Sequence, residues 1–209
     1  MSAAQRLLPI ARALARQGLR ILADAHFGSV AGAPSSISVS TSAEASRVLV
    51  VGQAGPEMWR HFSVAPEYQD GLPHPRDRWS RRTGDALAQQ FGCAVVYPFS
   101  GPPFHPFQHW LRAGQPGMGV SPLGILIHPR WGGWIRLRFA LLLPGQAAWP
   151  AKTPVREQGQ GQGGPCQQCV TKPCLRVCPV NAVSAEAGFA AQCCLSHVRD
   201  RDAECRTMG

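Results

Sequence analysis

The chain has 209 residues, a formal charge of +9 and eight cysteines. This length allows one large domain, or a domain with a small appendage, and a core that does not depend on metal to fold. No run of eighteen apolar residues predicts a membrane span, no secretory leader is recognisable, and no dense basic run or aromatic-studded motif predicts binding to nucleic acid. We therefore expect a cytoplasmic protein.

Residues 1–46 are predicted to form an amphipathic helix and a flexible lead-in to the rest of the chain. Over residues 4–23, leucines and alanines recur at three- and four-residue steps opposite arginines. The helix has no acidic residue before Asp24 and leads into a serine-rich stretch at 35–46, a composition that is also typical of organelle transit peptides. A basic surface helix followed by a flexible loop fits the same pattern, so both interpretations stay open.

Residues 47–145 are predicted to form a domain of strands and helices with loops rich in glycine, proline and aromatic residues. Short β-branched runs indicate buried strands, and glycines end the predicted elements. The order strand, loop, helix, strand favours an α+β or α/β fold. The predicted strands cover 47–52, 93–97 and 135–143, the predicted helical segments cover 57–62 and 79–91, and residues 66–78 are expected to be irregular.

Two features of this domain suggest phosphate binding, and each has a plainer explanation. Gly52 and Gly55 flank a loop, but the full dinucleotide fingerprint and the lysine of a Walker loop are absent. The densest basic group would suit a phosphate or an acidic partner, and equally a solvated start of a helix. This group comprises Arg76, Arg78, Arg81 and Arg82, with Trp79 among them.

The stretch 98–134 combines many glycines and prolines with aromatic residues. Because disordered segments are poor in aromatics, we expect ordered and packed loops here. His105, His109 and His128 lie in this stretch, and a structural role is favoured over catalysis or metal binding because none has a clear partner ligand. Residues 146–165 then lose hydrophobicity and contain a glycine- and glutamine-rich repeat, which predicts a flexible linker.

The last segment, residues 166–209, contains seven of the cysteines. Four of them follow the pattern Cys-x2-Cys-x4-Cys-x3-Cys-Pro, and closely spaced thiols of this kind are typical ligands of an iron–sulfur cluster. Disulfides would need an oxidising compartment, and structural zinc usually separates two cysteine pairs by a longer loop. The predicted cofactor ligands are Cys166, Cys169, Cys174 and Cys178.

The segment from Cys166 to Pro179 resembles the first half of a bacterial-type two-cluster ferredoxin, although its second spacer is two residues longer than usual. Residues 179–197 are similar to the iron–sulfur part of epoxyqueuosine reductase, where Cys194 and Ser196 correspond to an arginine-cysteine-isoleucine-serine element. Residues 121–134 are similar to the segment that precedes the clusters there. The layout, including residues 77–81, also resembles a family of uncharacterised ferredoxins.

The resemblance implies a small ferredoxin-like C-terminal segment with a [4Fe–4S] cluster. Two ligand sets stay open. All four cysteines of the motif hold one cluster, or Cys166, Cys169 and Cys174 take a distant fourth thiol while Cys178 joins a second cluster. The second set would add Cys193, Cys194 and Cys205. Cys193 and Cys194 are adjacent and seldom bind one centre together, because their side chains diverge.

We expect an iron–sulfur electron carrier rather than a self-contained enzyme. Lys172 and Arg176 lie inside the motif, where they would raise the reduction potential or guide an acidic redox partner. The alternative is a reductase related to epoxyqueuosine reductase that binds cobalamin, flavin or a substrate within residues 98–134, for which no catalytic residue is assigned. A third alternative is a zinc-binding structural or nucleic-acid module.

Overall fold

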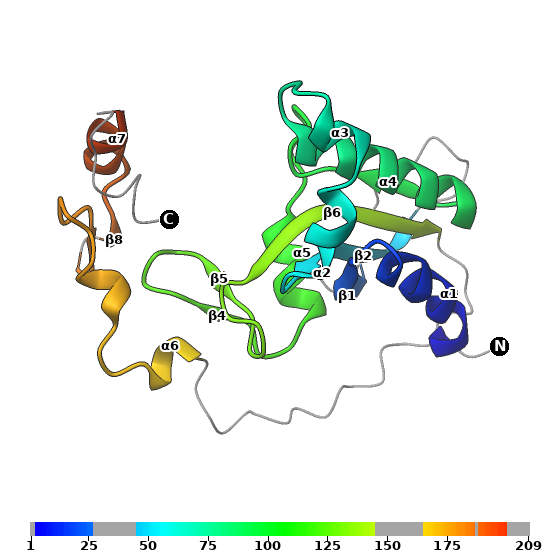
Figure 1. Cartoon of the computed structure of the whole chain (residues 1–209). Helices are drawn as coiled ribbons and strands as arrows, with labels where there is room; N and C mark the ends of the chain where they lie inside the picture. Colours follow the sequence, from blue (N-terminus) through cyan, green and yellow to red (C-terminus); the bar gives the residue numbers. More distant parts are fainter. Residues whose placement is uncertain (1–2, 27–44, 145–164, 187, 200–209) are drawn as a thin grey trace. The chain divides into compact units, whose positions relative to one another are not determined.

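The computed structural model describes residues 3–26, 45–144, 165–186 and 188–199 (Figure 1). The chain divides into two compact units. The first, called the sheet unit below, contains residues 1–116 and 134–158, and the second, called the cysteine unit, contains residues 117–133 and 159–209. The predicted linker and the serine-rich stretch lie almost wholly outside the described residues.

The sheet unit is built on a four-stranded sheet in which every neighbouring pair of strands is antiparallel. The order in space is β1-β2-β6-β3, so β6 separates β2 from β3 although it follows both in the chain. The protein is therefore α+β, and the parallel arrangement implied by an α/β fold is wrong. The strands are β1 (Arg20–His26), β2 (Ala45–Ala54), β3 (Ala94–Val96) and β6 (Ile135–Pro144).

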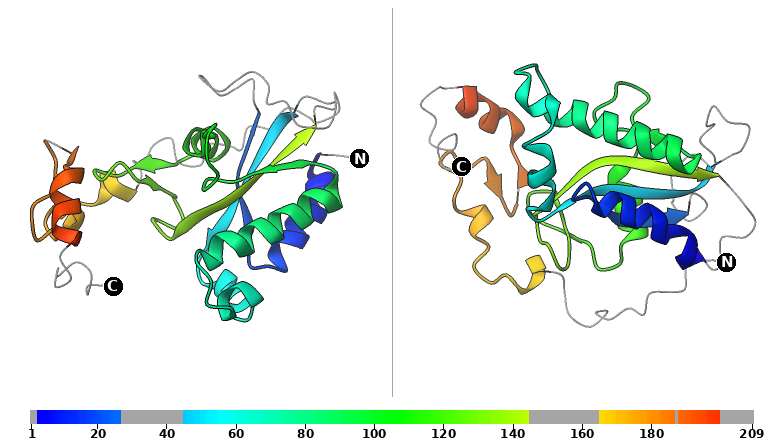
Figure 2. Two further views of the ribbon diagram at one scale, coloured as in Figure 1. Left: turned by 90° about the horizontal axis from the view of Figure 1, so that it is seen from above. Right: turned by 45° about the vertical axis from the view of Figure 1, so that its right-hand side comes forward.

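Helices cover both faces of this sheet. Figure 2 shows α1 and α4 on one face and α5 on the other. The helices are α1 (Ala3–Ala15), α2 (Glu57–Phe62), α3 (Pro66–Gln69), α4 (Pro75–Phe91) and α5 (Phe107–Gly114).

The core follows the alternation of side chains along the central strands. Leu49, Val51, Phe139 and Leu141 are fully buried in one cluster together with Trp79 of α4. The next residues along each strand point to the opposite face, where α5 packs on β1 and β2. Buried residues of that second layer include Val48, Val50, Ala140, Leu142, Trp110 and Leu111.

The helix predicted over residues 4–23 is too long. It ends at Ala15, and residues 20–26 form the edge strand β1, paired with β2 from Arg20↔Gly52 to His26↔Arg47. Leu14 is fully buried and Ile10 is 4% exposed, so the basic helix contributes to the core of the sheet unit.

The helix predicted over residues 79–91 begins earlier, at Pro75. Proline suits the first position of a helix, because an N–H at that position would have no partner within the helix. The start of α4 therefore lies within residues 66–78, which were expected to be irregular. The predicted end at Gly92 is confirmed, since Gly92 has a φ of 60° and its N–H caps the carbonyls of Ala88 and Gln89.

The cysteine unit has short elements joined by turns. Val120 and Leu126 pair in one two-stranded ribbon, Val183 and Phe189 pair in another, and α6 contacts β4. Among its described residues, Ala182 is the one buried hydrophobic side chain. The elements are β4 (Gly119–Val120), β5 (Leu126–Ile127), α6 (Pro165–Gln168), η2 (Pro173–Leu175), β7 (Val183–Ser184), β8 (Gly188–Phe189) and α7 (Ala191–Arg199).

A search of the described helices for a span long and apolar enough to cross a membrane found none.

Candidate functional site

The four cysteines of the motif lie on short turns of the cysteine unit. Cys166 is in α6, Cys169 follows that helix, Cys174 is in η2, and Cys178 precedes the turn that leads to β7. All four are free thiols that are partly exposed to solvent. They are accessible donors on one contiguous segment.

The turn between Cys169 and Cys178 is built around Pro173. Lys172 has a φ of 40°, in the left-handed region that non-glycine residues seldom adopt, and it caps η2. The N–H of Leu175 donates to the carbonyl of Lys172 at 3.0 Å, and the N–H of Arg176 donates to that of Pro173 at 2.9 Å. The longer second spacer of the motif, residues 170–173, therefore ends in a hydrogen-bonded 3-10 turn.

Cys178 accepts a hydrogen bond from the backbone. The N–H of Ala182 donates to the Cys178 Sγ at 3.2 Å, across a turn in which Asn181 has a φ of 51°. Amide hydrogen bonds to sulfur stabilise a thiolate and tune the potential of a metal centre that it binds. The cysteine motif did not predict this donor, because a main-chain N–H is not marked by any particular residue type in the sequence.

Cys193 and Cys194 both lie on α7. The Cys193 thiol donates to the carbonyl of Val180 at 3.5 Å, beside the turn that follows Cys178. Consecutive residues of a helix point in different directions, so the two side chains diverge along α7. Cys205, the remaining member of the second predicted ligand set, lies outside the described residues.

The donor set has the chemistry that a [4Fe–4S] cluster requires. Within the described residues, no group of three or more Cys, His, Asp or Glu side chains is gathered so that it could hold a metal ion. A cluster of this type takes four thiolate ligands. The four free thiols of the motif match that requirement, and holding a cluster would require their turns to draw together.

Exposed basic and apolar side chains surround these cysteines in the sequence. Lys172 and Arg176 are exposed, and the side chains of Val170 and Val177, each next to a cysteine, are 92% and 61% exposed. The segment therefore presents positive charge and apolar area to solvent.

Two of the three histidines of residues 98–134, His105 and His128, make contacts within the fold. The Nδ1 of His128 accepts hydrogen bonds from the N–H groups of Arg130 and Trp131, at 3.0 and 3.2 Å, and so fixes the turn after β5. Burial lowers the pKa of His128, as it lowers that of His105, whose ring stacks on Trp110. His109 is exposed.

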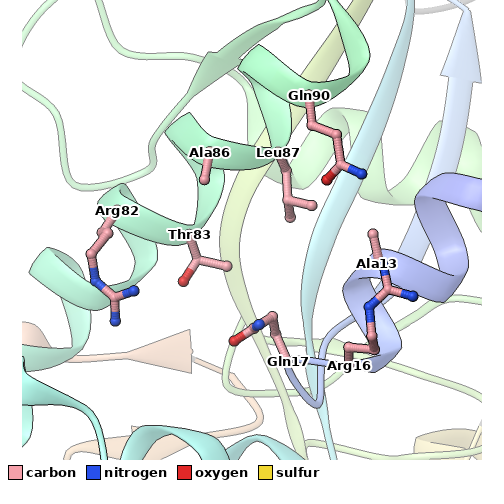
Figure 3. A pocket seen from close by; sticks show the side chains of 8 residues that line it. All are labelled: Ala13, Arg16, Gln17, Arg82, Thr83, Ala86, Leu87 and Gln90. Atoms are coloured by element: carbon pink, nitrogen blue, oxygen red, sulfur yellow. The ribbon is translucent and has the colours of Figure 1, made fainter.

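A hollow of about 220 Å³ lies between α1 and α4 of the sheet unit (Figure 3). It is polar at its rim, which includes Arg16 and Gln17 of the turn after α1 and Arg82 and Gln90 of α4. None of its lining residues falls within 98–134, the stretch in which the reductase alternative expects an organic cofactor. The Arg82 Nε donates to the Glu67 Oε1 at 2.5 Å, so this guanidinium already has a carboxylate partner.

No protein-family model matches the chain, and none of the curated proteins searched is significantly similar to it.

Proposed function

We propose that the chain is an iron–sulfur electron carrier whose [4Fe–4S] cluster is held by the four cysteines of the motif. The proposal is carried by one observation: four free, accessible thiols lie on a single short segment, and a main-chain N–H donates to the sulfur of Cys178. When bound, such a cluster supplies transfer of one electron at a time. The ligands would be Cys166, Cys169, Cys174 and Cys178.

The cysteine unit would then be a ferredoxin-like segment, similar to bacterial-type ferredoxins and to the iron–sulfur part of epoxyqueuosine reductase. Its own residues have two tasks in this proposal. The thiolates bind iron, and the Ala182 N–H stabilises the negative charge on the Cys178 sulfur. Lys172 and Arg176 add positive charge, which favours the reduced form and raises the reduction potential.

The proposed partner is a redox protein with an acidic docking surface. Exposed Lys172 and Arg176 supply charge that would steer it, and exposed Val170 and Val177 supply apolar contact area. Electron transfer to such a partner should slow as ionic strength rises, because salt screens exposed charges.

The decisive experiment is purification without oxygen, followed by counting of iron and acid-labile sulfide. We expect about four of each per chain, and an electron paramagnetic resonance signal after reduction with dithionite. A colourless protein with zinc and no labile sulfide would overturn the proposal in favour of the structural alternative.

Serine variants of single cysteines identify the ligands. Cys174→Ser and Cys178→Ser should each lose most of the iron, whereas Cys93→Ser should keep it. Cys93 is a suitable control because it lies in the sheet unit, and because burial raises the pKa of its thiol to about 11, which keeps it protonated.

The same assay separates the two ligand sets. If one cluster is held by the four motif cysteines, then Cys193→Ser and Cys194→Ser retain the full iron content. Loss of about half of the iron in either variant would indicate a second cluster that includes α7.

A further inference from the structure

In the part of the chain that the structure describes, Arg138 of β6 is a buried cation without a carboxylate partner. The residue is 7% exposed, and its one hydrogen bond to a described residue runs from Nη2 to the neutral amide oxygen of Gln53 at 3.2 Å. Its Nε is buried and has no hydrogen-bond partner among the described residues. Leaving a charge buried in this way is costly unless an anion compensates it.

A β-bulge puts Arg138 in this position. Val51 of β2 pairs with Phe139, but the next residue, Gly52, pairs with Leu137, so Arg138 is an extra residue in β6. Bulges redirect side chains and are over-represented next to functional sites. In a regular strand, the neighbouring side chains of Arg138 and Phe139 would point to opposite faces of the sheet. The bulge interrupts this alternation at Arg138.

The charges that act on Arg138 are mostly of its own sign. Burial, followed by the positive charge of Arg76, lowers the pKa of Arg138 to about 10, and Arg136 acts in the same direction while Asp77 opposes it. The guanidinium stays protonated at neutral pH. Arg76 and Asp77 belong to the first turn of α4, the positive end of a 17-residue helix.

Three of the four arginines in the basic group of α4 have partners. Arg78 donates to the Asp70 carboxylate at 2.6 Å, Arg82 pairs with Glu67, and Arg81 lies over the ring of Tyr97 at 4.6 Å. Arg76 is exposed. Most arginines of the basic group predicted from the sequence are therefore engaged in contacts within the fold. Among the described residues, the buried cation without a carboxylate partner is Arg138 of the sheet.

We propose that Arg138, together with Arg76 and the first turn of α4, binds a phosphoryl group. The guanidinium groups of Arg138 and Arg76 outnumber the nearby carboxylate of Asp77, and a phosphate supplies the negative charge that this part of the sheet unit lacks. The start of α4 adds the favourable dipole of a helix N-terminus. Arg138 supplies N–H donors from below, and exposed Arg76 remains accessible to the rest of a phosphorylated ligand. The assignment concerns the sheet unit and does not depend on the iron–sulfur proposal.

Inorganic phosphate is the first probe, titrated into the full chain by calorimetry and by thermal unfolding at constant ionic strength. We expect saturable binding and a rise in the unfolding temperature that sodium chloride does not reproduce. Glycerol phosphate, used in parallel, distinguishes a site for the free ion from one for a phosphomonoester. Absence of a phosphate-specific shift with both probes would overturn the proposal.

Arg138→Met tests the buried cation. Methionine replaces an unpaired charge by an apolar side chain, so the variant should unfold at the same or a higher temperature without phosphate and should bind phosphate at least ~10-fold more weakly. Arg76→Gln, at the exposed edge, should weaken binding about 3-fold.

The matched control is Arg112→Gln, which removes the same charge from an exposed position of α5 on the opposite face of the sheet. It should leave phosphate binding unchanged. Equal weakening in the Arg112 and Arg138 variants would show a general effect of net charge and would overturn the assignment. If Arg138→Met fails to fold, a loss of phosphate binding in Arg76→Gln but not in Arg112→Gln still supports the site, and equal binding in both refutes it.

Discussion

In the sheet unit, Trp79, Trp110 and Phe139 are at most 1% exposed, whereas Ala182 is the one buried hydrophobic residue in the described part of the cysteine unit. The first unit buries large apolar side chains on both faces of a sheet, and this burial stabilises it. The second consists of short helices, turns and two-residue strands, and such isolated ribbons are marginally stable at best. Under the proposed function, bound metal would contribute more than apolar packing to the order of the cysteine unit.

Removal of iron should affect the two units most differently. In the proposed holoprotein, trypsin cleavage after exposed Arg176 should accelerate at least ~10-fold when iron is removed, because metal binding and local folding are coupled. The unfolding temperature of the sheet unit should stay constant. Mass spectrometry of the fragments measures the rate of cleavage, and circular dichroism measures the unfolding temperature. A single unfolding transition of the whole chain that shifts when iron is removed would contradict the expected difference between the two units.

Trp79→Ala should have the complementary effect on the sheet unit. This side chain is 1% exposed and its ring packs against Phe62 at a centroid distance of 5.9 Å. Its loss should lower the free energy of unfolding by about 3–5 kcal/mol. Denaturant titration measures this change, and iron per folded chain should match that of the unaltered protein. Parallel loss of iron would mean that the cysteine unit depends on the sheet.

Gly18→Ala should destabilise the turn between α1 and β1. Gly18 has a φ of 66°, and an added Cβ would meet the Met58 nitrogen at 2.5 Å. Left-handed strain and overpacking together should cost about 2–4 kcal/mol. Gly71→Ala is the matched control, because Gly71 has a φ of 70° but no atom within 4 Å of the added Cβ, so only strain of about 1–2 kcal/mol remains. Equal unfolding temperatures of the two variants would exclude the steric contribution.

Acid should weaken the sheet unit slightly through Glu67. The hydrogen bond from Arg82 holds the pKa of this carboxyl below its ordinary value of 4.5. The stabilisation is therefore present above pH 4.5 and is lost as the pH falls toward the lower pKa of the folded state. Because Arg82 is 57% exposed, the contribution should be below about 1 kcal/mol. Glu67→Gln should remove this part of the pH dependence between pH 6 and 3, and an unchanged profile would contradict it.

Where a sequence pattern fits either a helix or a strand but not both, it predicted the elements of the sheet unit well. The β-branched run after Arg47 and the alternation after Ile135 correspond to β2 and β6, and Gly92 ends α4 as expected. β1 was missed because Leu19 and Leu22 fit a helical step as well as a strand, and pairing with β2 decides between the two.

The alternation of the sequence after Ile135 puts Arg138 on the polar side of a regular strand, and local sequence gives no sign of the bulge that accompanies its burial. The thiols of the candidate site were visible from their spacing. The Ala182 N–H that contacts Cys178 was not, because backbone donors depend on the path of the turn.

The order of the sheet has a consequence for synthesis on the ribosome. Strand β6 lies between β2 and β3 in the sheet but is the last of the four strands in the chain. Strands β2 and β3 therefore leave the ribosome before β6, each with the edge that will pair with β6 still unpaired. Until residue 144 has left the exit tunnel, the nascent chain exposes β-branched edges that can pair with other chains. Ribosome stalling or premature termination before β6 should therefore yield insoluble fragments, while a halt shortly after it should release a chain able to complete its sheet.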